Sequence, residues 1–250
     1  MKAFKPLLLS LLAGLSTLIG YIFTYIKIKN KENLISFSLS LSMIIMISIS
    51  LIELLPNSSN KILLNYGIIY GYLIVLLVFL LGYLTVYLIN NRISNEKSLY
   101  KIGIISFISL LLHNFPEGIA VFISSYNDIK IGLKICISII MHNIVEGMSI
   151  SLPLYYGGVK RAEVFKLTFY SSIAEPLGAL LSYLFLKEYM SELLLSFTLV
   201  FVSGLMISLS INEIYNELKK YNNKKYIVLG MIFGIIASLL LKLIGEGTPT

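Results

Sequence analysis

The feature that most constrains this chain is a series of eight long apolar stretches, separated by short segments rich in charged residues and asparagine. Each stretch has about 20 residues or more, the length of helix needed to cross the hydrocarbon core of a bilayer. They cover residues 6–28, 34–55, 62–89, 99–124, 131–153, 163–186, 191–215 and 226–244. The pattern predicts an all-α, polytopic membrane protein with eight transmembrane helices.

The composition supports this prediction. Charged residues make up 13% of the 250 residues, about half the share found in a soluble domain, and hydrophobic residues make up 57%. The connections are too short to hold a soluble domain, so residues 1–244 are expected to form one transmembrane domain. Residues 245–250 (GEGTPT) read differently from the rest and are expected to be a tail, which could be a remnant of cloning.

The basic residues indicate topology rather than a nucleic-acid partner. The net charge is +7, but Lys and Arg lie in short connections and form no dense face of the kind that nucleic acid requires. Of the 20 basic residues, 13 lie on the side of the first, third, fifth and seventh connections, and 7 lie on the side of the termini. Because basic loops stay in the cytoplasm, both termini are expected outside.

Five carboxylic acids interrupt the apolar stretches, whereas no Lys or Arg lies deep within any of them. The acids are Glu53, Glu117, Glu146, Glu175 and Glu213. An ionisable group at membrane depth costs several kcal/mol, so such residues usually face a cavity and carry function. Five carboxylates with no basic partner repel one another unless a cation visits them. The sequence therefore indicates that metal ions or protons pass through this protein.

Two segments resemble each other closely enough to suggest an internal repeat. Residues 46–54 read MISISLIEL and residues 206–214 read MISLSINEI. Chance similarity between segments rich in Ile, Leu and Ser is the alternative. The segments lie in the second and seventh stretches, which cross the membrane in opposite directions. The favoured prediction is therefore an inverted repeat of helices 1–3 and 6–8 around helices 4 and 5, with Glu53 near the outer end of its helix and Glu213 near the inner end.

Both histidines of the chain occur in one pattern. Residues 113–118 read HNFPEG and residues 142–147 read HNIVEG, each near the middle of its stretch. On a helix, positions i and i+4 share a face, so His113 lies above Glu117 and His142 above Glu146. A short connection makes the two helices antiparallel neighbours, and the two faces can therefore point at each other. Imidazole and carboxylate suit zinc, iron and manganese, so the pattern predicts a metal site at membrane depth.

Further polar groups lie close to this pattern. Pro116 leaves the carbonyl of Leu112 without its helical partner and favours a kink beside the site. The sixth stretch contains Glu175 followed by Pro176, another mid-span carboxylate next to a proline. Glu175 is the natural third acid near a pair of metals, and Asn114 and Asn143 offer side-chain oxygens. The single cysteine, Cys136, excludes an internal disulfide and a cysteine-based metal motif.

These motifs resemble the ZIP family of metal-ion transporters, in particular its bacterial ZupT-like branch. The resemblance covers nearly the whole chain. It rests on Glu53 ahead of Leu-Leu-Pro, HNFPEGIA at 113–120, HNIVEGMSIS at 142–151, AEPLGALL at 174–181 and Glu213. Two positions depart from the family pattern: Val145 stands where the branch usually has proline, and Asn212 stands where relatives often have aspartate.

The resemblance implies a 3+2+3 helix arrangement with a binuclear metal centre between helices 4, 5 and 6. Carried onto this chain, one ion would be held by His113, Glu117, His142 and Glu146. The other would be held by Asn114, Glu117, Asn143, Glu146 and Glu175, with Glu117 and Glu146 bridging. Because Val145 replaces the usual proline, a kink in helix 5 is in question. Because Asn212 replaces aspartate, the inner exit would carry less negative charge.

The sequence thus predicts uptake of divalent transition-metal ions, zinc or iron first and manganese, cobalt or cadmium as further candidates, by alternating access past Glu53 and Glu213. The metal would be cargo, with no resident cofactor. A proton- or sodium-coupled antiporter and an intramembrane metal-dependent hydrolase are the alternatives, although no separate base or nucleophile favours an enzyme. The expected location is the bacterial inner membrane, with the lipid bilayer as partner and a homodimer as one option.

Overall fold

The computed structural model describes residues 3–27, 29–93, 98–186 and 192–246, and within these ranges the ordered elements are all helical. The elements are α1 (Phe4–Ile22), η1 (Phe23–Tyr25), α2 (Lys31–Ile49), η2 (Ser50–Leu54), α3 (Leu55–Tyr66), α4 (Ile68–Arg92), α5 (Ser98–Asn127), α6 (Ile129–Tyr156), α7 (Arg161–Leu181), η3 (Ser182–Leu186), α8 (Glu192–Ser208), η4 (Leu209–Ile214), α9 (Tyr215–Leu218) and α10 (Lys224–Glu246). The short elements η2, η3 and η4 are π-helical turns that continue a helix.

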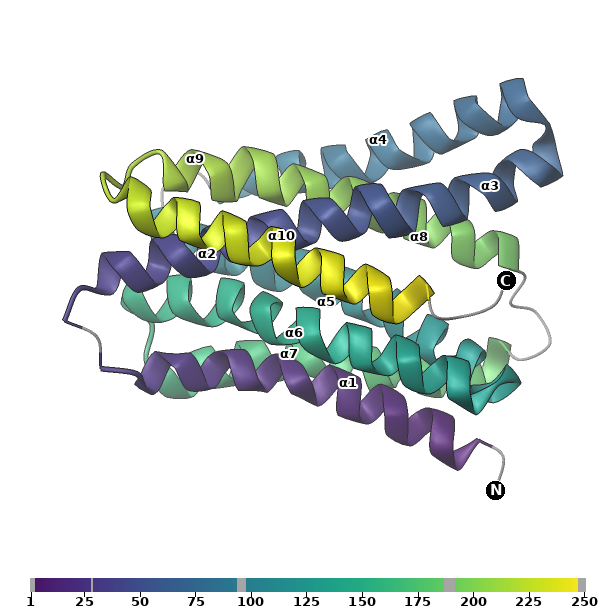
Figure 1. The fold of residues 1–250 in the computed structure, drawn as a ribbon, viewed down its shortest axis with the longest axis horizontal. Helices are drawn as coiled ribbons and strands as arrows, with labels where there is room; N and C mark the ends of the chain where they lie inside the picture. Colours follow the sequence, from purple (N-terminus) through teal and green to yellow (C-terminus); the bar gives the residue numbers. More distant parts are fainter. Residues whose placement is uncertain (1–2, 28, 94–97, 187–191, 247–250) are drawn as a thin grey trace.

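These elements make eight passes through the molecule. Seven described helical segments are long and apolar enough to cross a membrane. The remaining pass, α7 with η3, is less apolar because its first two turns carry Arg161, Glu163 and Lys166. The start of α1 and the end of α10 lie at the same end of the molecule (Figure 1). The all-α, polytopic fold expected from the sequence is confirmed. Of the expected tail, residues 247–250 lie outside the described residues, and 245–246 end α10.

The second and third passes divide at a different place from the one expected. The helix does not end near Pro56, because that proline lies at the start of α3, directly after the π turn η2, and the helical run continues to Tyr66. The break is at Gly67, whose φ of +76° is a conformation that only glycine adopts readily. Residues 62–66 therefore belong to the second pass, and Glu53 lies within a continuous helical run.

The helices form two groups. Helices α1, α5, α6 and α7 pack on one another, and α2, α3, α4, α8 and α10 form the second group. Figure 1 shows α1, α6 and α7 below and α3, α4, α8 and α10 above. Contacts between the groups run mainly from α6 to α2 and from α5 to α8. The two histidine motifs thus lie on neighbouring helices of the first group, and their helices also face the second group.

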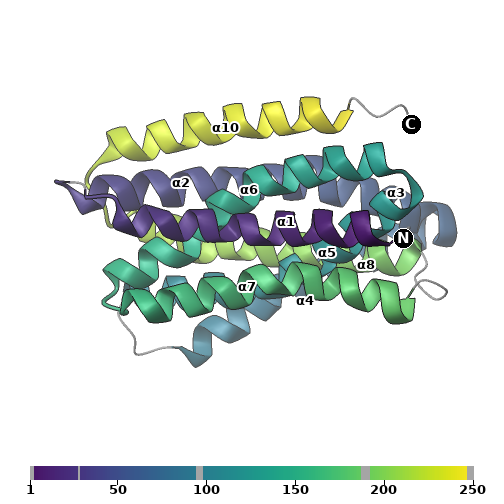
Figure 2. The ribbon, with the colours of Figure 1, turned by 90° about the horizontal axis from the view of Figure 1, so that it is seen from below.

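Two helices of the second group face outward. In the most apolar window of α4 only 11% of the residues are buried, and in that of α10 only 17%. Figure 2 shows α10 along one edge of the molecule, with α4 toward the opposite side. Apart from Asn91, Arg92, Lys224, Lys225 and Lys242 near the helix ends, their exposed side chains are Leu, Ile, Val, Phe and Tyr. Lipid tails are the solvent that suits such surfaces.

The repeated segments have the same local structure and meet at one crossing. Both contain a π turn around their glutamate, η2 around Glu53 and η4 around Glu213. The hydroxyl of Ser50 donates to the Sδ of Met206 at 3.6 Å, and the hydroxyl of Ser210 donates to the Sδ of Met46 at 3.7 Å. Exchanging the two repeats therefore exchanges one contact for the other. Such reciprocity is the mark of a two-fold arrangement and agrees with an inverted repeat.

Candidate metal centre

The two histidine motifs lie on unbroken helices that pack directly on each other. His113 is in the middle of the 30-residue helix α5, and His142 is in the middle of the 28-residue helix α6. Because these helices run antiparallel, their middle turns meet. All four motif residues, His113, Glu117, His142 and Glu146, are 4% exposed or less. Helix α5 continues through Pro116 without interruption.

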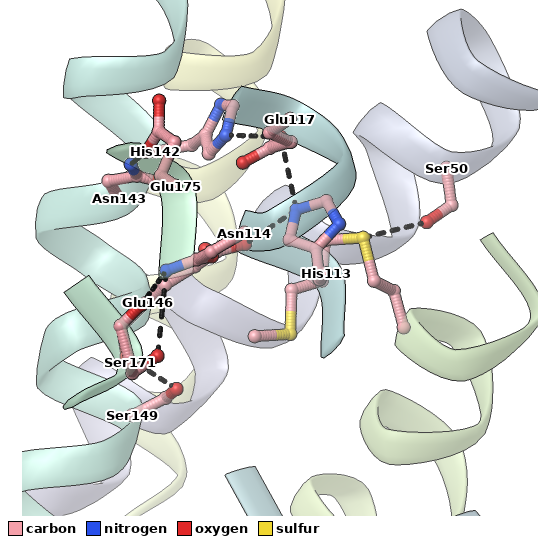
Figure 3. A network of polar contacts seen from close by, with 12 residues as sticks. Ser50, His113, Asn114, Glu117, His142, Asn143, Glu146, Ser149, Ser171 and Glu175 are labelled. Carbon is pink, nitrogen blue, oxygen red and sulfur yellow. Dashed lines mark hydrogen bonds and ion pairs between the residues drawn. The ribbon is translucent and has the colours of Figure 1, made fainter. Parts of the chain in front are cut away.

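These four side chains converge on one point. Glu117 Oε1 lies 3.1 Å from the Nε2 atoms of both His113 and His142, and His113 Nε2 lies 3.7 Å from Glu146 Oε1. Figure 3 shows Glu117 between the two imidazole rings, whose centroids are 6.4 Å apart. One ligand atom each from His113, His142 and Glu146 lies within 4.8 Å of the others. Ligand atoms this close together can surround one ion, since zinc binds nitrogen and oxygen at roughly 2 Å.

A second set of polar side chains borders this cluster. Asn143 Nδ2 donates to Glu175 Oε2 at 2.8 Å, which links α6 to α7. Asn114 Nδ2 donates to the carbonyl of Ser171 at 3.0 Å, which links α5 to α7. Glu175 is fully buried. With both amide nitrogens engaged, the Oδ1 atoms of Asn114 and Asn143 are the atoms available to a cation.

The close approach of the helices depends on the glycine that follows each motif glutamate. A Cβ atom on Gly118 would lie 1.8 Å from the carbonyl oxygen of Glu175, and one on Gly147 would lie 1.9 Å from that of Thr17. No larger residue fits at either position. Small residues allow helix backbones to touch in this way in membranes, where packing rather than the hydrophobic effect holds helices together. Gly118 thereby places α7, and with it Glu175, beside α5.

The centre holds an unusual number of buried polar atoms without partners. Apart from the close His–Glu pairs given above, the following atoms make no hydrogen bond with any described residue: His113 Nδ1, Asn114 Oδ1, Glu117 Oε2, His142 Nδ1, Asn143 Oδ1, both carboxylate oxygens of Glu146, and Glu175 Oε1. Each of the seven residues predicted for the metal site contributes at least one of them. A buried polar atom without a partner costs about 1–3 kcal/mol, and more when it is charged.

Within the part of the chain that the structure describes, no lysine or arginine pairs with these carboxylates. Among the described residues, Glu117 and Glu146 form ion pairs only with the two histidines. Three carboxylates, two imidazoles and two amide oxygens form the donor set that zinc, iron and manganese accept.

The two remaining predicted acids lie outside this cluster. Glu53 is exposed on the π turn η2, close enough to His142 and Glu117 for their charges to act on it. Glu213 is 7% exposed, its Oε1 makes no hydrogen bond with a described residue, and the charges of Lys101 and Lys220 act on it. Both lysines belong to the basic end of the molecule, so Glu213 lies toward that end.

Two positions near the centre have roles that were not foreseen. The carbonyl of Ala13 on α1 accepts from Asn143 Nδ2 at 3.0 Å, and the carbonyl of Thr17 touches Gly147. A signal existed, because small residues recur at helical spacing between Ala13 and Gly20.

Asn212, by contrast, lies away from the centre, where its Nδ2 donates to the hydroxyl of Tyr83 on α4 at 2.9 Å. The buried Met46 and Met206 are packing residues that accept from serine hydroxyls.

Comparison with known proteins gives a consistent result. The family described as ZIP Zinc transporter matches residues 90–242. The protein described as zinc transporter ZupT from Oceanobacillus iheyensis is 33% identical over 249 residues, which cover 91% of this chain and 93% of that protein. The ZupT proteins of Chlorobium luteolum and Campylobacter jejuni are 34% and 31% identical, and each comparison covers at least 94% of both chains. This chain therefore belongs to the ZIP family of membrane transporters and is similar to its ZupT members.

Proposed function

We propose that this protein carries zinc into the cell through the centre between α5, α6 and α7. One observation carries the proposal: seven buried side chains of α5, α6 and α7 have ligand atoms that make no hydrogen bond with a described residue, and no lysine or arginine among the described residues pairs with their three carboxylates. A divalent cation supplies the missing charge and the missing partners together. The names of the ZupT relatives favour zinc as this cation. The family consists of transporters, so the cation is cargo and the protein is not an enzyme.

The two-ion arrangement implied by the family resemblance is part of this proposal. His113, Glu117, His142 and Glu146 would hold one ion, consistent with their mutual distances. Asn114, Glu117, Asn143, Glu146 and Glu175 would hold the second, consistent with the unpartnered oxygens of both asparagines. Three carboxylates against two dications leave one net positive charge. The second ion is therefore held less tightly and can exchange.

The path through the protein follows from the outlying acids. An ion would enter past Glu53, which is exposed and feels the charges of the centre, and would leave past Glu213 at the basic end. The positive-inside rule places that end in the cytoplasm, so the termini lie outside and the direction is uptake. Movement of the group α1, α5, α6 and α7 against the second group would open the centre to each side in turn.

The decisive experiment is zinc uptake into liposomes that contain the purified protein. The double substitution of His142 and Glu146 by Ala removes one imidazole and one carboxylate from the centre and should abolish uptake. Glu163→Gln, which neutralises an exposed acid at the start of α7, is the matched control and should transport normally. Undiminished uptake by the double variant would refute the site assignment.

The same assay tests the choice of metal and the mechanism. An N/O donor set admits iron, manganese, cobalt and cadmium as well as zinc, so competition between these ions ranks them. Ligands lose protons when metal binds and regain them when it leaves, so uptake should vary with the pH on each side. Proton or sodium flux without any transition metal would favour the antiporter alternative instead.

A further inference from the structure

A cavity of about 570 Å³ opens at the basic end of the molecule, remote from the metal centre. Its walls come from η1 at the end of the first pass, from the start of α2, from the end of α6 and from the start of α7. It therefore lies where the chain leaves the bilayer on the side assigned to the cytoplasm. The transport path proposed above uses none of its residues.

Arg161 is held rigidly in the wall of this cavity. Its guanidinium lies 4.8 Å from the ring centre of Tyr25 and 4.6 Å from that of Tyr155. Its Nη2 donates to the carbonyl of Thr24 at 3.1 Å and to the hydroxyl of Tyr155 at 2.7 Å. A guanidinium has five N–H donors in a planar fork, so Nη1 and Nε keep three that bond to no described residue. Arg161 is thus positioned in advance to bind an anion.

Other groups in the cavity favour the same kind of ligand. Lys27, Lys29 and Lys31 line it and pair with no acid among the described residues, and Glu32 is the one acid in the wall. With Arg161 the wall has an excess of three positive charges. Thr24, which is 1% exposed, also lines the cavity, and its carbonyl is the one that accepts from Arg161.

We propose that this cavity binds the phosphate group of an anionic phospholipid from the cytoplasmic leaflet. Tyr25, Tyr155 and Tyr156 lie in the wall at the ends of their helices, the depth at which tyrosine meets lipid headgroups. The apolar residues Ile22 and Ile26 are 58% and 44% exposed beside it and offer a surface for the acyl chains. Basic pockets between helices on the cytoplasmic side are typical binding places for acidic headgroups.

The test is lipid binding by the purified full chain, measured by native mass spectrometry with phosphatidylglycerol and with phosphatidylcholine as the neutral comparison. A basic residue near an anionic lipid surface contributes about fivefold in affinity. The variant Lys29→Gln/Lys31→Gln should therefore bind phosphatidylglycerol about 25-fold more weakly. The variant Lys224→Gln/Lys225→Gln removes two charges from the same end outside the cavity and should lose less than about twofold.

Two further measurements make the test specific. Arg161→Lys keeps the charge but loses the planar fork and its stacking on the tyrosines, so it should also bind phosphatidylglycerol several-fold more weakly. Equal losses in the two double-lysine variants, or no preference for phosphatidylglycerol over phosphatidylcholine, would overturn the proposal. So would displacement of the lipid by an equal concentration of glycerol phosphate, because the ligand would then be a soluble anion. None of these measurements depends on zinc transport, so they test the lipid site independently of the proposed function.

Discussion

Helices α1 and α7 pack against the central pair α5 and α6 in equivalent ways but bring different chemistry to it. The carbonyl of Ala13 on α1 accepts from Asn143, as the carbonyl of Ser171 on α7 accepts from Asn114. One turn further along, the carbonyl of Thr17 touches Gly147, as that of Glu175 touches Gly118. Each contact on one side thus has its counterpart on the other.

The difference lies in the side chains. At the position where α7 has Glu175, α1 has Thr17, which is fully buried and whose hydroxyl bonds to no described residue. The helix packing is therefore two-fold symmetric, whereas the ligand set is not. The backbone contacts belong to the architecture of the repeat, and the chemistry depends on single side chains placed upon it. This separation can be tested by changing either the residues at the backbone contacts or the side chains that differ between α1 and α7.

The largest effect is expected from the glycines that set the architecture. Gly118→Ala and Gly147→Ala each place a methyl group within 2 Å of a backbone oxygen that cannot move away. Each should destabilise the protein by about 3 kcal/mol, the upper range for overpacking, and to a similar extent because the contacts are equivalent. Thermal unfolding in detergent measures this, with the outward-facing Leu77→Ala as control. A marked effect of only one glycine would contradict the equivalence.

An intermediate effect is expected from the side chain that breaks the symmetry. Glu175→Gln keeps the shape and a hydrogen-bonding group toward Asn143 but removes one of three carboxylates. Zinc bound per protein should fall from two ions to one, and uptake should fall at least tenfold, since even the loss of a side chain that only supports a metal ligand typically costs a factor of about 10–100. Calorimetry and elemental analysis count the ions. The control Thr17→Val should leave the stoichiometry unchanged, and two ions on Glu175→Gln would refute the asymmetric assignment.

The smallest effect is expected at the crossing of the repeats. Ser50→Ala and Ser210→Ala each remove one hydroxyl-to-sulfur contact. Each should cost about 0.5 kcal/mol, the lower range for a buried hydrogen bond. The costs should agree with each other because the contacts are reciprocal. Chemical unfolding of the two variants side by side measures this, and a clear difference between them would show that the two repeats are not equivalent there.

The sequence predicted the passes and the convergence of the two His–Glu pairs because both depend on short-range regularities. Apolar length defines a span, and the i, i+4 spacing of His113 with Glu117 and of His142 with Glu146 fixes which side chains share a face. The end of the second pass was predicted wrongly. Pro56 and the polar residues after it resemble a helix end, but proline is tolerated in the first turn of α3, so the helix continues until Gly67 ends it.

The contribution of α1 to the centre could not be predicted, for a different reason. Its carbonyl groups, not its side chains, meet Asn143 and Gly147, and every residue carries a carbonyl. Only the spacing of small residues in α1 indicates that another backbone comes close. The π turns η2 and η4 could not be predicted either. Their hydrogen bonds span one residue more than those of an α-helix, and no characteristic sequence marks this change.

The backbone contacts at Gly118 and Gly147 bear on how fast such a protein can work. Under the function proposed above, the main-chain contacts between α1 and α6 and between α5 and α7 prevent the centre from loosening by itself to release an ion. Release then waits for a displacement of the whole four-helix group, a motion of the microsecond-to-millisecond class or slower. The zinc flux should therefore saturate as the zinc concentration rises and should depend steeply on temperature. Both are expected when transport is limited by a conformational change rather than by diffusion through a pore.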